Sequence, residues 1–354
     1  MNAKIIFCWF LIGIGIGFFI TILTVKDPES IRHINKFKVA EVSLRKGPHP
    51  NLTQTSIENV KKIRILCFLH TMPKTHSSRA VHIQQTWGKH CDKLLFSSTL
   101  TDINLGALGF NVTNDHGHMW GKVKLMMQHI YKNFLSDYDW FIKGDDDTFL
   151  ITENLRYMLS AYSTEDPIYF GYKFNTTDHK QGYFSGGSGY VMSRQTVRIF
   201  VEKMLTNKEF YRKSEGEQPR DCHIETDNRV EDWEISLCLD HYNVYAGDSR
   251  DLLKRDRFLT FWPEVHLFGK PDPNSWYWQR KYYWNDEGLD CCSNYTISFH
   301  YIQGKYQYSM YFLTYRLQPF GIRRHFPPQP KKRDFTEVKN ILDQERVDVS
   351  LRGY

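Results

Sequence analysis

The sequence lacks a concentrated stripe of basic residues. In its 354 residues, 46 lysines and arginines stand against 40 acidic residues, which gives a net charge of +6. Part of that small excess lies in one short run near the C-terminus, Lys331-Lys332-Arg333. Proteins that bind nucleic acid carry basic charge clustered on one face or along one helix. The composition therefore argues against nucleic acid as a partner.

Charge is also missing from Ile5 to Val25, an apolar run of 21 residues. As a helix, such a run spans about 30 Å of hydrocarbon. A cleaved signal peptide has a shorter apolar stretch that is followed by a small-residue cleavage site. Here the small residues, all glycines, lie within the run, and no Ala-x-Ala follows it. We therefore predict an uncleaved membrane anchor over residues 5–25, with residues 1–4 as a cytoplasmic end.

Basic residues flank the predicted anchor on both sides, so charge alone does not decide its orientation. N-glycosylation triplets decide the orientation, because they are glycosylated only in the lumen of the secretory pathway. Four of them follow the anchor, at Asn51, Asn111, Asn175 and Asn294. Together they predict a single-pass type II membrane protein with a luminal body.

The cysteines agree with a luminal body. Of seven cysteines, one lies within the predicted anchor and six lie beyond it. An even set in an oxidising compartment indicates disulfides, although six cysteines allow many pairings. We predict the pairs Cys67–Cys91, Cys222–Cys238 and Cys291–Cys292. The two adjacent cysteines could instead have separate partners.

Apolar periodicity divides the rest of the chain. Residues 26–60 have no such periodicity and contain Pro28, Gly47, Pro48 and Pro50, which is typical of a stem. Beyond them, strand-like and helix-like segments alternate, and this predicts an α/β domain with a mostly parallel sheet. The segments are 63–69 (strand), 79–87 (helix), 94–96 (strand), 123–130 (helix), 140–142 (strand), 152–159 (helix), 168–170 and 190–192 (strands) and 197–204 (helix). We predict one catalytic domain over 61–326 and a charged, flexible tail over 327–354.

Three consecutive carboxylates follow the predicted strand 140–142. Side chains alternate along an extended chain, so Asp145 and Asp147 are expected to face one way and Asp146 the other. Ligands of α/β sheets bind beyond the carboxyl ends of the strands. Two carboxylates there suit a hard cation such as Mn²⁺ or Mg²⁺, with a diphosphate as co-ligand. A bare Asp-x-Asp also occurs in acidic turns and calcium loops, so this motif does not decide alone.

A second acidic pair, Glu231-Asp232, opens a segment of helical periodicity. The helix dipole stabilises a carboxylate at that end by roughly 0.3–1 kcal/mol, so Asp232 could be a helix cap or a general base. The segment 276–284 is rich in aromatic residues, which could form a pocket wall or pack in the core. His300 follows an apolar run and could be a structural residue or a metal ligand. The glycine-rich loop 185–189 is equally a ligand-binding loop or a turn.

Several sequence blocks, taken in order, resemble glycosyltransferase family 31 and its core 1 β1,3-galactosyltransferase branch. The resemblance extends from about Ile63 to Gly321. Its blocks are residues 139–148, 167–171, 181–191, 231–232, 246–251, 276–278, 291–293 and 298–301. The Asp triplet and the Glu-Asp pair are shared by the wider family. The motifs Gly-Asp-Ser-Arg-Asp, Trp-Tyr-Trp and Cys-Cys-Ser are specific to the branch.

The resemblance implies a GT-A fold and a type II anchor in the Golgi membrane. It also implies Mn²⁺, UDP-galactose as donor and inversion at the anomeric carbon of the transferred sugar. The acceptor would be GalNAc on Ser or Thr of glycoproteins and glycopeptides, with glycolipids as a second acceptor class. A homodimer is implied as well.

Site roles follow from the matching positions. The resemblance assigns the metal to Asp145, Asp147 and His300, with Asp147 as the expected direct ligand, and the general base to Asp232. It assigns contacts with the acceptor sugar to Trp276, Tyr301 and Glu231. For UDP it points to Thr71, Pro73, Arg79, Trp120, Lys122 and Asp145.

The chain departs from the family pattern in two places. Trp233 follows the Glu-Asp pair where a small aliphatic residue is usual, and Ser236 stands where a glycine is expected. The segment 208–229 is longer and more charged than in close relatives. These departures keep open another family 31 β1,3-glycosyltransferase with a different UDP-sugar or acceptor. A non-catalytic, chaperone-like relative is less favoured, because such relatives lack the Asp motif that this chain retains.

Overall fold

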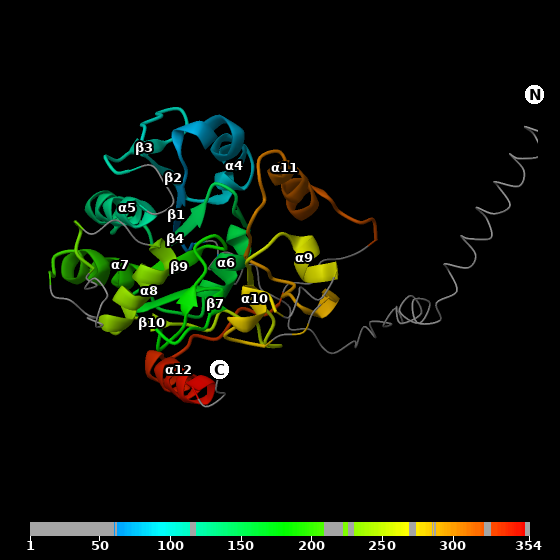
Figure 1. Ribbon diagram of the computed structural model, residues 1–354. Coiled ribbons are helices and arrows are strands. Elements are labelled where there is room, and N and C mark those ends of the chain that lie inside the picture. The colour runs from blue at the N-terminus through cyan, green and yellow to red at the C-terminus, as the bar shows by residue number, and fades with distance from the viewer. Residues whose placement is uncertain are drawn as a thin grey trace, which may run out of the picture. The chain divides into compact units, whose positions relative to one another are not determined.

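A seven-stranded mixed sheet is the centre of the fold (Figure 1). Its strands, in spatial order, are β10 (Tyr245–Ala246), β6 (Ile168–Gly171), β9 (Tyr190–Ser193), β4 (Trp140–Asp145), β1 (Ile65–His70), β2 (Lys93–Ser98) and β3 (Ala107–Gly109). Only β9 runs antiparallel to its neighbours, β4 and β6. The predicted α/β class with a mostly parallel sheet is therefore confirmed.

The structure is a computed structural model. It describes residues 60, 62–113, 118–208, 222–225, 230–268, 274–284, 286, 288–321 and 327–350. The predicted anchor, all but the last residue of the predicted stem, the sequon at Asn51 and most of the segment 208–229 lie outside these residues. Within them, no helix has the length and apolar character needed to cross a membrane. Asn111 and Asn294 are exposed and Asn175 is half-buried.

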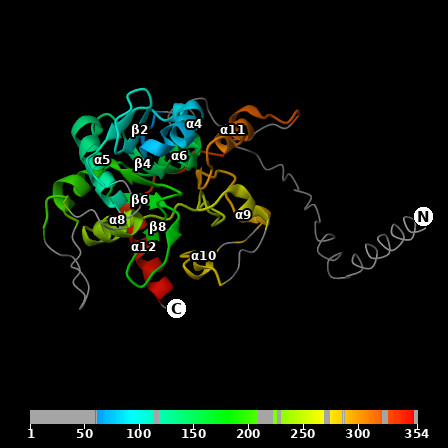
Figure 2. The ribbon, with the colours of Figure 1, turned by 45° about the horizontal axis from the view of Figure 1, so that its top comes forward.

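Helices cover both faces of the sheet (Figure 2). Alternate residues of β1 enter two separate hydrophobic cores, one on each face, as the period of two in a strand requires. One core is closed by α5 (Met119–Phe134), α7 (Arg194–Ile199) and α8 (Glu231–His241). The other is closed by α4 (Val81–Gln85) and α6 (Thr152–Leu159). The central strands are thus buried on both sides, which explains their apolar runs.

Two of the predicted helices are divided in the structure. The segment predicted as 79–87 consists of a π-helical turn (His76–Ala80), α4 and a 3₁₀ turn (Trp87–His90). The division follows Thr86, whose backbone leaves the helical region and whose hydroxyl donates to the His82 carbonyl at 2.7 Å. Similarly, α7 continues as the π-helical turn Phe200–Met204.

Smaller elements surround the carboxyl ends of the central strands. A three-stranded sheet joins β11 (Phe258–Leu259), β12 (Ser298–Phe299) and β5 (Phe149–Leu150), and a hairpin joins β7 (Lys173–Phe174) and β8 (Tyr183–Phe184). The short helices are α9 (Pro263–Phe268), α10 (Trp276–Gln279) and α11 (Tyr306–Tyr311), followed by a π-helical turn at Phe312–Arg316 and a 3₁₀ turn at Gly288–Asp290. A further 3₁₀ turn spans Pro73–Thr75.

All three predicted disulfides are present. Cys67–Cys91 connects β1 to the segment that precedes β2. Cys222–Cys238 connects the segment 222–225 to α8. Cys291 and Cys292 are bonded to each other rather than to separate partners.

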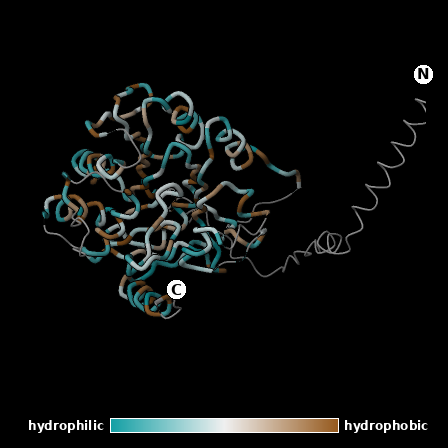
Figure 3. Tube along the Cα trace, in the orientation of Figure 1, coloured by the Kyte–Doolittle hydropathy of each residue, from teal (hydrophilic) through white to brown (hydrophobic). Residues whose placement is uncertain are grey.

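The C-terminal segment differs from its prediction as a flexible tail. It forms α12 (Phe335–Ser350), a helix of 16 residues. The Asp334 carboxylate accepts the Thr336 and Glu337 N–H groups at 2.9 and 3.2 Å, which caps the helix. Its buried Val338, Leu342 and Val349 share one face, so hydrophobic and hydrophilic residues alternate along it (Figure 3). The high charge of the segment as a whole concealed this apolar stripe.

We expect Leu342→Ala to lower the free energy of unfolding by about 2–5 kcal/mol, because it leaves a cavity beneath α12. Leu342 is only 4% exposed, whereas its neighbour Ile341 is 51% exposed. Ile341→Ala is therefore the matched control, with an expected change within about 0.5 kcal/mol. Urea unfolding of both variants measures the difference. Equal effects at the two positions would show that α12 does not pack as described.

Candidate active site

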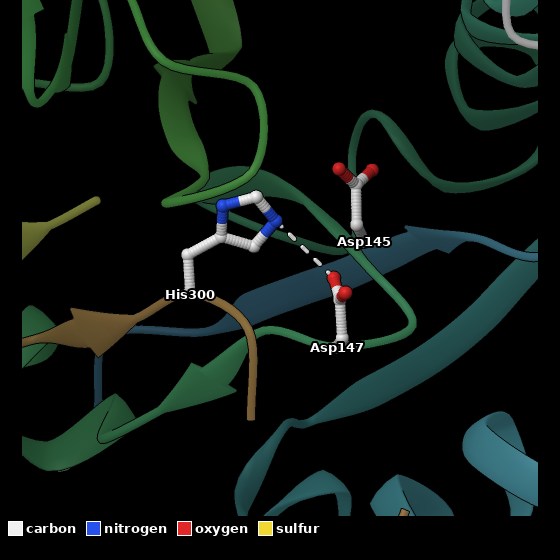
Figure 4. Close-up of side chains that lie close together, drawn as sticks. All are labelled: Asp145, Asp147 and His300. Carbon is white, nitrogen blue, oxygen red and sulfur yellow. Dashed lines mark ion pairs between the residues drawn. The ribbon is translucent and has the colours of Figure 1, made fainter. Parts of the chain in front are cut away.

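The acidic run forms a tight turn at the end of β4. The Thr148 N–H donates to the Asp145 carbonyl at 3.0 Å, and the Thr148 hydroxyl accepts the Asp145 N–H at 2.9 Å. Asp145 and Asp147 lie on one side of this turn with His300, and their ligand atoms are all within 4.8 Å of one another (Figure 4). Asp146 is directed away from them, to Thr71 and Thr75. The predicted division of the three carboxylates is confirmed, although a turn rather than an extended strand produces it.

His300 reaches this turn through pairing of the small sheet. β12 pairs antiparallel with β5, which begins two residues after Asp147, and the Ile302 N–H donates to the Asp147 carbonyl at 2.8 Å. The His300 Nε2 then lies 3.2 Å from the Asp147 Oδ1. The glycine loop 185–189 makes room for the ring, because a Cβ on Gly187 would lie 2.0 Å from the imidazole. Only glycine fits at that position without a shift of the ring.

The donor set fits a hard divalent cation. Two carboxylates and one imidazole offer oxygen and nitrogen atoms, which suit Mn²⁺. Burial would raise the pKa of Asp147, but His300 and Arg79 outweigh burial, and the pKa is below the usual value for an aspartate. Asp147 is therefore ionised at neutral pH, as a metal ligand must be. Burial raises the pKa of Asp146, and its hydrogen bonds from Thr75 and Thr71 offset only part of that rise.

A buried lysine connects this turn to α8. The Lys143 side chain is fully buried, and its Nζ lies 2.9 Å from Asp145 Oδ1 and 3.0 Å from Glu231 Oε2. It also donates to the Gly186 carbonyl at 3.2 Å. The Tyr190 hydroxyl donates to the second oxygen of Glu231. Both oxygens of Glu231, a predicted acceptor contact, are therefore engaged by protein groups, and this placement favours a supporting role.

Asp232 lies in the first turn of α8, beside that ion pair. Its Oδ2 accepts the Gly186 N–H at 3.0 Å. Burial raises the pKa of Asp232 above the usual value for an aspartate, while the Gly186 N–H and Lys143 offset part of the rise. A carboxylate with a raised pKa is a stronger base in its ionised form.

We expect Lys143→Met to lower the free energy of unfolding by about 3–5 kcal/mol, because Glu231 would stay buried without its counter-charge. Burial already raises the pKa of Glu231 to about 7 despite Lys143. Without the lysine the native state would hold a proton that the unfolded state releases, so the variant should lose stability as pH rises from about 5.5 to about 8. Urea unfolding at both pH values measures this.

The double variant Lys143→Met/Glu231→Gln is the control for that interpretation. Removal of the unpaired charge should recover part of the lost stability and flatten its pH dependence. An unchanged pH slope in the double variant would show that Glu231 is not the group responsible.

A pocket of about 190 Å³ opens over these groups. Its lining includes the polar residues Asp145, Glu231, Asp232 and His300 and the aromatic residues Phe174, Tyr183, Phe261, Trp276 and Tyr301. Trp276 is 50% exposed, whereas the adjacent Tyr277 and Trp278 are buried. The aromatic segment is thus both a pocket wall and core packing, and Trp276 is its ring that lines the pocket.

The predicted UDP residues separate into two groups. Thr71 and Arg79 contact the acidic turn, where Arg79 Nη1 lies 3.3 Å from Asp146 and 3.4 Å from Asp147. Pro73 begins the short 3₁₀ turn next to Thr71. Trp120 is completely buried against Phe200, and Lys122 is 2% exposed. Pro73 and Arg79 are partly exposed, whereas Thr71, like Trp120 and Lys122, is buried in this structure.

The structure also accounts for the unusual residues on α8. The Trp233 ring packs edge-on against His179, with ring centroids 4.6 Å apart, and lies 5.3 Å from the ring of Tyr183. The Ser236 hydroxyl donates to the Asp232 carbonyl at 2.9 Å. Trp233 thus supports the pocket wall from behind, and neither residue is among those that line the pocket.

Sequence reasoning gave no role to several residues of the site. The sequence could have indicated Lys143, because it lies two residues before Asp145 and so shares its face of β4. It could have indicated Gly187 as part of the glycine-rich loop. No sequence pattern indicates Gln303, whose Nε2 lies 3.4 Å from Asp147 Oδ2, because its position depends on the pairing of β12 with β5.

Comparisons with known proteins identify relatives of this chain. The family described as Fringe-like matches residues 60–227. A glycoprotein-N-acetylgalactosamine 3-beta-galactosyltransferase 1 of Xenopus laevis is 34% identical over 337 residues, which cover 92% of this chain and 89% of the relative. A beta-1,3-glucosyltransferase of Mus musculus is 28% identical over 39% of this chain and 29% of its own length.

A solved structure of a glycosyltransferase involved in glycosylation of the major capsid of PBCV-1 covers 41% of this chain and 67% of that one, at 13% identity and a TM-score of 0.27. That likeness is too low to bear on the fold. The length of the match to the Xenopus relative is sufficient by itself: the chain belongs to the Fringe-like glycosyltransferases of family 31. Within the family, its long match is to a glycoprotein-N-acetylgalactosamine 3-beta-galactosyltransferase.

Proposed function

We propose that the chain is an inverting β1,3-galactosyltransferase that transfers galactose from UDP-galactose to the 3-hydroxyl of GalNAc on Ser or Thr. The observation that carries the proposal is that Asp232 lines the same pocket as the exposed ring of Trp276 and as Asp145 and His300, two members of the cluster that Asp147 completes. A base, a cation site and a sugar-stacking surface are the parts that a single displacement on a sugar needs. The 34% identity to the Xenopus enzyme supports the choice of donor and acceptor.

In this mechanism, Asp145, Asp147 and His300 would hold Mn²⁺. When bound, the ion neutralises charge that develops on the diphosphate leaving group. Asp232 accepts the proton of the GalNAc 3-hydroxyl, whose oxygen attacks the anomeric carbon of galactose from the face opposite UDP. One displacement converts the α-linked donor into a β-linked product. Trp276 and Tyr301 would hold the acceptor ring against Asp232.

The proposal includes the setting of the enzyme. The domain would have the GT-A fold and would face the Golgi lumen, held by the predicted type II anchor over residues 5–25, and the enzyme would be a homodimer. The three disulfides support an oxidising compartment. Glycoproteins and glycopeptides would be its acceptors.

An assay of residues 27–354 with Mn²⁺, UDP-galactose and a GalNAc-Thr peptide tests the proposal. We expect a β1,3-linked disaccharide that is lost when a chelator is added. Transfer from UDP-GlcNAc but not from UDP-galactose would instead favour another family 31 enzyme. A folded, UDP-binding protein with no transfer to any acceptor would contradict the proposal.

A further inference from the structure

A second hollow adjoins the catalytic pocket. It has a volume of about 610 Å³ and is lined by Trp262, Glu264, Tyr301, Gln303 and Tyr306, which we call the α9–α11 groove. α9 supplies Glu264, and α11 begins with Tyr306, whose hydroxyl donates to Glu264 Oε1 at 2.8 Å. Both ribbon views show α9 and α11 on the same side of the domain (Figures 1 and 2).

Tyr301 is the residue that the groove shares with the catalytic pocket. Its ring stacks on that of His300, with ring centroids 3.8 Å apart. It is nearly perpendicular to the ring of Trp262, with ring centroids 6.1 Å apart. It is 41% exposed and has a φ of 60°, a left-handed conformation that bulky residues seldom adopt. Such backbone conformations persist where the surrounding structure imposes them, often at ligand sites. A ligand that passes Tyr301 moves from one hollow into the other.

The groove has aromatic walls and one charge. Trp262 is 40% exposed, and the carboxylate of Glu264, itself exposed, is the only charged group among the described residues of its lining. Gln303 adds an amide that can donate to and accept from a peptide backbone. Aromatic rings with carbonyl, amide and carboxylate groups suit an extended polypeptide with a cationic side chain. The alkyl chains of a lipid could not form hydrogen bonds or an ion pair with Glu264 and Gln303.

We propose that the α9–α11 groove binds the polypeptide on one side of the acceptor GalNAc and that Glu264 favours a basic residue there. This inference rests on the proposed function, because it needs the acceptor sugar in the catalytic pocket. Tyr301 would mark the exit of the glycosidic bond from the pocket, with the peptide continuing over Trp262.

The test compares three kinds of acceptor: methyl α-GalNAc, which has no peptide, GalNAc-Thr peptides with lysine at each flanking position in turn, and the same peptides with glutamate. The unaltered chain should prefer the best lysine peptide over its glutamate counterpart roughly three- to fivefold in kcat/KM, as expected for an exposed ion pair. Glu264→Gln should abolish this preference, and Glu264→Lys should reverse it. Transfer to methyl α-GalNAc should not change in either variant.

Trp262→Ala should raise the KM for all peptides severalfold and leave the KM for methyl α-GalNAc unchanged. Trp284→Ala is the matched control, because Trp284 is 66% exposed and lies outside both hollows. Thermal unfolding of each variant checks that the fold is intact.

Each contrary outcome overturns a distinct statement. An unchanged lysine-to-glutamate ratio in Glu264→Lys would overturn the peptide groove. So would an equal rise of KM for methyl α-GalNAc and peptides in Trp262→Ala, or a rise of KM for UDP-galactose instead. Transfer from the unaltered chain to a lipid-linked GalNAc that Trp262→Ala selectively weakens would assign the groove to lipid. Absence of transfer to every GalNAc acceptor would overturn the proposed function, and the groove with it.

Discussion

Asp232→Asn should lower kcat by about 10²–10⁴-fold, because an amide cannot take the proton of the attacking hydroxyl. The geometry of the site should survive, since an asparagine oxygen can still accept the Gly186 N–H that Asp232 accepts at 3.0 Å. UDP binding and the KM for the acceptor should therefore change little. Steady-state kinetics and calorimetric titration with UDP measure the two effects.

The pH profile distinguishes this role from a structural one. Burial raises the pKa of Asp232, so activity of the unaltered chain should fall on the acid side as this carboxylate is protonated. The residual activity of Asp232→Asn should lack that acid limb. Asp240→Asn, which changes a carboxylate near the other end of α8, should keep both rate and profile. Near-normal turnover of Asp232→Asn would remove Asp232 from the role of base.

Much of the fold could be predicted because its signals are local. The apolar runs that became β1, β4 and β9 are continuous in the sequence, and burial on both faces of a sheet gives such runs. The acidic turn follows β4 directly, so its position at the carboxyl end of a strand required no knowledge of distant contacts. The same holds for the start of α8, where the acidic residues and the apolar face are adjacent.

Other features depended on contacts between distant segments. His300 lies beside Asp147 only because β12 pairs with β5, and the ring fits only because Gly187 lacks a side chain. Each two-residue strand is too short to give a periodic signal, so the pairing could not be seen in advance. The resemblance to the family assigned His300 to the metal site, whereas the sequence pattern alone left open whether it is a structural residue or a ligand.

The error at the C-terminus has a different cause. Over the whole segment 327–354, charge and proline outweigh the apolar residues, and average composition then predicts disorder. The stripe of Val338, Leu342 and Val349 occupies positions four and seven residues apart, which is a helical spacing. α12 also contributes Glu345, which accepts the Tyr283 hydroxyl at 2.9 Å and so connects the helix to the aromatic segment. The apolar stripe that indicates a helix becomes visible when a window of helical length is considered rather than the whole segment.

Asp147→Ala should reduce metal-dependent transfer by more than about 100-fold, since loss of a direct ligand should exceed the 10–100-fold typical of outer partners. Asp146→Ala is the informative comparison. Asp146 lies in the same turn but is bonded to Thr71, Thr75 and Arg79 rather than to His300. It should therefore weaken UDP-sugar binding or stability while the Mn²⁺ concentration for half-maximal activity stays unchanged. Titration with Mn²⁺ in the presence of UDP separates the two variants, and equal loss of Mn²⁺ affinity in both would contradict the assignment of Asp147 as the ligand.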